Sequence, residues 1–109
     1  MATPHAGACL PLDLRQPGET LSVHKSHALV KTDAFEAIRI VIPKDHNVCH
    51  EHQLEGPITV QCLEGWIAFT ADDDKHSLKA GQWTYLPPGV RHTISGVEDS
   101  LVLLTIIFP

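Results

Sequence analysis

The sequence has little that would bring the chain to a nucleic acid or a membrane. It has no run of Lys or Arg, and 13 acidic residues outnumber 8 basic ones, which gives a formal net charge of −5. Nucleic acids and anionic lipids attract basic surfaces, so we expect neither as a partner. No apolar stretch reaches the roughly 18 residues that a membrane-spanning helix needs.

Cysteine is scarce, and the features of a signal peptide are absent. The three cysteines, Cys9, Cys49 and Cys62, cannot all pair with one another. The opening residues, MATPHAGACLPLDLRQPGE, have neither the basic nor the apolar region of an export signal. Because the cytoplasm keeps thiols reduced, we expect free cysteines in a cytoplasmic protein.

Helix patterns are weak, and from Ser26 onward short segments rich in β-branched and aromatic residues alternate with Gly, Pro or Asp. This pattern predicts an all-β sandwich or barrel. A chain of 109 residues holds one such core. We expect a single barrel domain over 26–109 after an irregular, Pro-containing arm over 1–25. The expected strands are 27–32, 35–43, 58–65, 66–71, 76–81, 82–87, 91–96 and 100–108.

Histidines gather in one segment, HNVCHEHQLEGPITVQCLEG, which runs from His46 to Gly65. His50 and His52 are two positions apart, so on a strand both side chains face the same side. A second segment, GQWTYLPPGVRH, ends at His92. Its Pro-Pro-Gly sequence predicts a reversal of the chain, because proline fixes φ and glycine permits positive φ. His92 then begins the next strand.

Together the two segments resemble the paired motifs of the cupin superfamily, G-x5-H-x-H-x(3–4)-E-x6-G and G-x5-P-x-G-x2-H-x3-N. The matching positions are His50, His52, Gly65, Gly81, Pro87, Gly89 and His92. The motifs are separated by 15 residues, a compact spacing of the kind found in small microbial cupins. The resemblance implies a small double-stranded β-barrel, or jelly roll, of the RmlC-like type.

Three positions depart from the cupin pattern. Lys44 stands at the first motif's opening glycine, and Gly96 stands at the second motif's final asparagine. Ile58 occupies the position where cupins usually have a glutamate ligand, and Glu55 is the nearest acidic residue. The resemblance still allows a metal, because some cupin dioxygenases are similar in using three histidines without the glutamate.

The resemblance implies that His50, His52 and His92 hold a divalent metal ion inside the barrel. Neutral imidazoles suit Fe, Zn, Ni or Cu, and three of them leave coordination positions open for water or substrate. The identity of the metal stays open. The alternative is a metal-free pocket whose histidines hydrogen-bond a ligand or one another.

Five other residues are candidates for the same site. His46 is a possible additional ligand if its loop folds over the pocket mouth, although an exposed loop histidine is the simpler interpretation. Glu55 is a possible ligand if its loop folds inward. Ile58, Val60 and Cys62 share strand parity, so we expect them to line the pocket as an apolar wall.

Two functional hypotheses follow from the resemblance. The first is a small metalloenzyme of the dioxygenase or isomerase type that acts on a small oxygen-containing substrate. The second is a non-catalytic binding or sensor cupin that holds a small molecule; a storage or structural β-domain has less support. In each case we expect a homodimer, because cupins commonly associate through sheet edges, here with the arm and the apolar last strand.

The triplet Asp72-Asp73-Asp74 resembles part of a calcium-binding loop, but the glycine and glutamate that should follow are missing. We therefore interpret it as a hairpin turn made soluble by its charge. The last strand is apolar on both faces, which predicts burial between sheets or against a second subunit.

Overall fold

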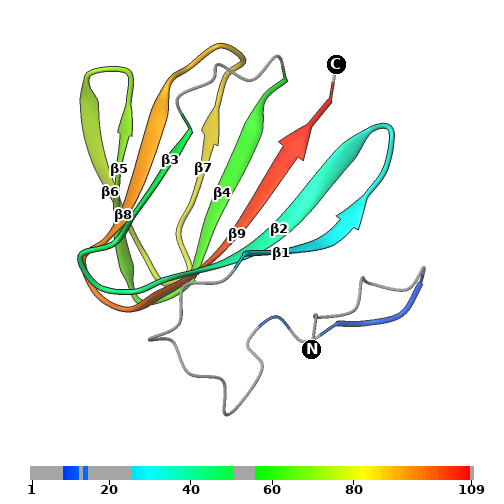
Figure 1. The fold of residues 1–109 in the computed structure, drawn as a ribbon, viewed down its shortest axis with the longest axis horizontal. Coiled ribbons are helices and arrows are strands. Elements are labelled where there is room, and N and C mark those ends of the chain that lie inside the picture. Colours follow the sequence, from blue (N-terminus) through cyan, green and yellow to red (C-terminus); the bar gives the residue numbers. More distant parts are fainter. Residues whose placement is uncertain (1–8, 13, 15–25, 51–55, 109) are drawn as a thin grey trace.

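The computed structural model describes residues 9–12, 14, 26–50 and 56–108, and describes only the backbone of residues 26, 27, 49 and 50. These residues form nine strands in two sheets, and all paired strands are antiparallel. Figure 1 shows the five-stranded sheet A on the right and the four-stranded sheet B on the left. The all-β fold predicted from the sequence is confirmed.

Sheet A has the strand order β1-β2-β9-β4-β7, and sheet B has the order β3-β8-β5-β6. The strands of sheet A are β1 (Ser26–Lys31), β2 (Phe35–Ile42), β9 (Ser100–Ile107), β4 (Ile58–Glu64) and β7 (Trp83–Leu86). The strands of sheet B are β3 (Asn47–His50), β8 (His92–Gly96), β5 (Trp66–Ala71) and β6 (Asp74–Lys79).

The hydrophobic core lies between the two sheets and takes alternate residues from each strand. In β4, Ile58, Val60 and Cys62 are buried, whereas Thr59 and Gln61 between them are only partly buried. The predicted parity of these residues is confirmed. The other buried core residues are Ile40, Ile42, Ile67, Phe69, Leu78, Leu86, Ile94, Val102 and Leu104.

Strand β9 lies inside sheet A, between β2 and β4. Its residues Leu101 and Val102 point to opposite faces, and both are fully buried. On the outer face of the sheet, the fully buried Arg39 donates from Nε to the Leu14 carbonyl, 2.8 Å away. The expected burial holds for the first part of β9, whereas Ile107 near its end is 39% exposed. One described residue of the N-terminal segment, Leu14, contacts sheet A.

Gly96 shows why this chain departs from the second cupin-like motif at its last position. A Cβ added there would lie 2.6 Å from the Pro43 carbonyl oxygen and 2.9 Å from that of Glu98. The Gly96 backbone also exchanges hydrogen bonds with Asp45 and His46. An asparagine side chain does not fit between these backbones, so glycine is a packing requirement at this position.

The β5–β6 hairpin turns at Asp72 and Asp73, which confirms the interpretation of the aspartate triplet as a turn. Asp72 has φ +53°, a conformation that Asp tolerates better than most residues. Strand β6 already begins at Asp74, two residues before the expected start.

Cys9 and Cys62 are free thiols, as expected for these two cysteines. In the described part of the chain, no helix is long and apolar enough to cross a membrane.

Candidate functional site

His92 is the first residue of β8 and only 2% exposed. Its register partner on β3 is His50, and its partner on β5 is Ala71. Ala71 in turn pairs with Asp74 of β6. Directly opposite residues of antiparallel strands occupy the same face of a sheet. A single row across sheet B therefore brings together His50, His92, Ala71 and Asp74.

The start of β8 is held by hydrogen bonds to the two residues that precede His92. The preceding turn contains Gly89 with φ +80°, as the Pro-Pro-Gly sequence predicts. Arg91 donates its backbone N–H to the Asp72 carboxylate at 3.2 Å, and its carbonyl accepts from the Asp72 N–H at 2.8 Å. The His92 Nδ1 atom lies 3.5 Å from the Val90 carbonyl oxygen. These contacts fix the backbone from which the imidazole projects.

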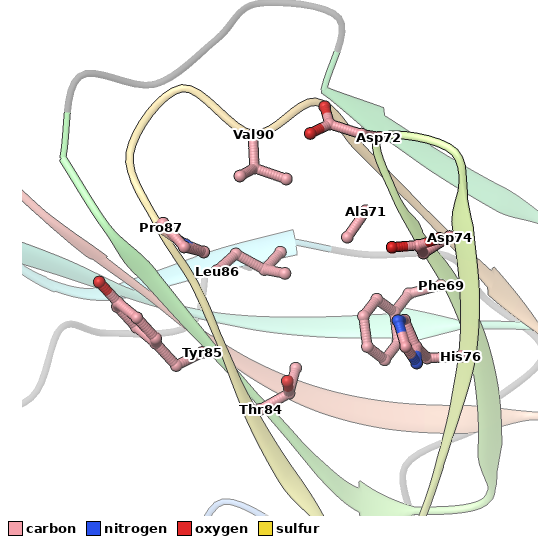
Figure 2. Close-up of a pocket in the computed structure, with 10 residues that line it drawn as sticks. All are labelled: Phe69, Ala71, Asp72, Asp74, His76, Thr84, Tyr85, Leu86, Pro87 and Val90. Atoms are coloured by element: carbon pink, nitrogen blue, oxygen red, sulfur yellow. The ribbon is translucent and has the colours of Figure 1, made fainter.

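A cavity of about 300 Å³ opens next to this row, between the β5–β6 hairpin and β7 with the turn that follows it. Figure 2 shows Asp72, Asp74 and His76 on one side and Leu86, Pro87 and Val90 on the other. The remaining lining residues are Phe69, Ala71, Thr84 and Tyr85. The cavity adjoins the histidine row through Ala71 and Val90.

No protein-family model and no curated protein sequence matches the chain. Solved structures do match. A conserved protein of unknown function from Streptococcus pyogenes has a TM-score of 0.83 and 23% identity, over 100% of this chain and 96% of that one. A cupin superfamily protein from Desulfitobacterium hafniense has a TM-score of 0.81 and 20% identity, over 96% of each chain.

An RmlC-like cupin family protein with a double-stranded β-helix fold, from Methanocaldococcus jannaschii, has a TM-score of 0.76 and 17% identity, over 93% of each chain. This chain has the cupin fold. The resemblance recognised in the sequence is therefore confirmed for the fold, and at these identities it is the fold alone that the similarity shows.

Within this cupin barrel, two of the proposed site residues lie outside the described part of the chain. These are His52 and Glu55. Among the described residues, no group of three or more His, Cys, Asp or Glu side chains is arranged to hold a metal ion. Because His52 and the side chain of His50 are not among them, the three-histidine centre stays a prediction.

His46 is exposed, and its Nδ1 atom lies 3.1 Å from the Lys44 carbonyl oxygen. Its backbone bonds to Gly96, the last residue of β8, whereas His92 is the first. The rise of a strand separates these ends by roughly 13 Å. The structure thus brings His50 and His92 together by register and leaves His46 at the other end of the β3–β8 pair.

The cupin glutamate position, Ile58, is 2% exposed and packs in the core with Val60 and Cys62. Burial raises the pKa of the Cys62 thiol, and a hydrogen bond from Sγ to the Glu64 carbonyl at 3.4 Å opposes this only in part. Cys62 is therefore a neutral, unreactive thiol at neutral pH. Other residues line the cavity of Figure 2, and a pocket-lining role for these three residues stays a prediction.

The acidic wall of the cavity is the feature that the sequence analysis missed, because the aspartate triplet was interpreted only as a soluble turn. The signal that reveals it is alternation along β6. Asp74 and His76 line the cavity, whereas Lys75 between them lines a separate groove with Thr70 and Thr93. His76 pairs with the core residue Phe69, so His76 lies on the core-facing side of sheet B. Asp74, two residues before His76 on the same strand, lies on that side too.

Proposed function

We propose that the barrel holds a divalent metal ion, Fe, Zn, Ni or Cu, between His50, His52 and His92. The observation that carries this proposal is the register of β3 and β8, which makes the buried His92 the direct partner of His50. Adjacent positions on neighbouring strands suit two ligands of one ion, and His52 follows His50 by two residues. The chemistry of this donor set fits such a metal.

The surroundings of His92 support a ligand role for its imidazole. A proton on Nδ1, which faces the Val90 carbonyl, leaves the lone pair of the ring on Nε2. The two hydrogen bonds between Asp72 and Arg91 hold the backbone next to His92, so the position of the His92 Cα is fixed. The buried position of His92 also excludes water from one side of the site.

Such a centre would act on a small oxygen-containing substrate, by dioxygenase chemistry with iron or isomerase chemistry with another metal. When bound, the ion supplies a Lewis acid with open coordination positions. The chain itself contributes the imidazoles, the apolar core around them and an adjoining cavity of about 300 Å³ for the substrate. We also propose a cytoplasmic location, in keeping with the free thiols Cys9 and Cys62.

Elemental analysis of the purified protein tests the proposal. We expect close to one equivalent of metal per chain in the parent, and its loss in His50→Ala, His52→Ala and His92→Ala. His76→Ala removes an exposed imidazole from β6 and is the matched control, in which the metal content should stay unchanged. A parent protein that takes up no metal after reconstitution with each of the four ions would overturn the proposal.

The second candidate is a non-catalytic binding or sensor cupin, and one observation favours it. The position of the usual glutamate is the buried Ile58, so β4 offers no acid or base there. A bound small molecule that is recovered unchanged after long incubation with metal-loaded protein would support this candidate. Conversion of that molecule, abolished in His92→Ala, would support the enzyme.

A further inference from the structure

The cavity between the β5–β6 hairpin and β7 has a volume of about 300 Å³, at the lower end of the range of small-molecule sites. It also lies next to the histidine row. Its lining residue Ala71 is the register partner of His92, and its lining residue Val90 carries the carbonyl nearest to His92 Nδ1. A molecule in this cavity would therefore lie beside the proposed metal centre.

Besides the imidazole of His76, the ionisable side chains among the described lining residues are carboxylates and the Tyr85 phenol. Asp72 and Asp74 line the cavity, and none of the lining residues that the structure describes is Lys or Arg. The Asp72 carboxylate already accepts a hydrogen bond from the Arg91 backbone. The Asp74 side chain is exposed and makes no hydrogen bond or ion pair within the described part of the chain. Asp74 is thus the carboxylate that a ligand can engage.

The rest of the lining is largely apolar or aromatic. Leu86 and Pro87 lie across the cavity from Asp74, and Val90 lies near Asp72, as Figure 2 shows. On the aspartate side, the rings of Phe69 and His76 stack with centroids 5.1 Å apart and an interplanar angle of 27°. A flat aromatic surface and an aliphatic wall suit a compact apolar ligand body.

We propose that this cavity binds small molecules that carry a cationic amine or amidine on a compact apolar body. The cation lies at Asp74, and the apolar part packs against Leu86 and Val90. An ammonium group forms a charge-assisted hydrogen bond with a carboxylate, whereas a ligand carboxylate would face two like charges. This inference deepens the proposed function, on which it rests, because it names the substrate class of the barrel site.

The test is calorimetric titration of the full chain, stripped of metal, with three probes of similar size: benzylammonium, benzyl alcohol and benzoate. We expect benzylammonium to bind about fivefold more tightly than benzyl alcohol, and benzoate to bind most weakly. Asp74→Asn should weaken benzylammonium about two- to fivefold and leave benzyl alcohol unchanged, because only the charge is removed. Added NaCl should reduce the same difference.

Asp73→Asn is the matched control, since Asp73 is exposed in the same turn but does not line the cavity. The inference is overturned if benzoate binds as tightly as benzylammonium, if no probe binds, or if Asp73→Asn has the same effect as Asp74→Asn. Because the titrations use metal-free protein, they are independent of the metal analysis. A chain without metal can still prefer amines, and a metalloprotein can fail to do so.

Discussion

The Cys62 thiol links burial to the pH dependence of stability. Its pKa in the folded protein is raised above the ordinary value of 9.0. Above pH 9 the unfolded chain therefore releases a proton that the folded chain retains, so stability falls as the pH rises toward the folded pKa. Below pH 9 the thiol is neutral in both states, and its contribution is constant. We expect the slope from this group to reach at most about 1.4 kcal/mol per pH unit.

Urea unfolding between pH 8 and pH 11 measures this slope, and a comparison with Cys62→Ala isolates the contribution of this thiol from that of all other groups. The variant should be less stable by about 1 kcal/mol at pH 7, because a buried sulfur is removed, but its stability should fall less steeply at high pH. Cys9→Ala removes an exposed thiol and should retain the parent slope. Equal slopes in the parent and Cys62→Ala would contradict the prediction.

Asp72 connects two elements of sheet B, because it lies in the β5–β6 turn and bonds to Arg91, directly before strand β8. Its backbone and carboxylate both bond to Arg91, the residue before His92, and it holds φ +53°. Asp72→Ala removes the acceptor and disfavours this conformation, so we expect a loss of about 1–2 kcal/mol of stability. The metal affinity of the proposed centre should also fall, about tenfold, because the His92 backbone is less well fixed.

Asp72→Asn removes only the negative charge, because asparagine keeps the oxygen acceptor and tolerates positive φ. It therefore separates the loss of charge from the loss of the hydrogen bond and of the backbone conformation. It should behave like the parent in thermal unfolding and in competition with a metal chelator. Asp73→Ala, in the same exposed turn, is the control for substitution at this hairpin. If Asp72→Ala binds metal as tightly as the parent, Asp72 does not position His92.

Eight of the nine described strands could be predicted because their signals are local, whereas β3 (Asn47–His50) was not among the expected strands. Alternation in Ile58, Val60 and Cys62, and the turn residues between strands, need no knowledge of the rest of the chain. The row that joins His92 to Ala71 and Asp74 has no such signal, because it depends on which strands become neighbours in sheet B. The acidic cavity wall follows from that pairing, so it emerged only from the structure.

For the whole molecule, we expect a homodimer that uses the outer face of β7. This strand is an edge of sheet A, and its side chains Trp83 and Tyr85 are 58% and 50% exposed. Both belong to residue types that are enriched at protein interfaces, and among the described strands β7 has a hydrogen-bonded neighbour on one side only, so its other side can pair with another chain. The contact through the last strand that was expected from the sequence would not use a sheet edge, because β9 lies between β2 and β4.

Sedimentation velocity of the parent and Trp83→Glu tests this arrangement. The parent should sediment as a dimer, and a carboxylate in the centre of the interface should convert it to a monomer with an unchanged circular dichroism spectrum. Ser77→Glu adds the same charge to the exposed strand β6 of sheet B and should leave the dimer intact. A monomeric parent would rule out the dimer. A Trp83→Glu variant that remains dimeric would show that the dimer interface does not lie at β7.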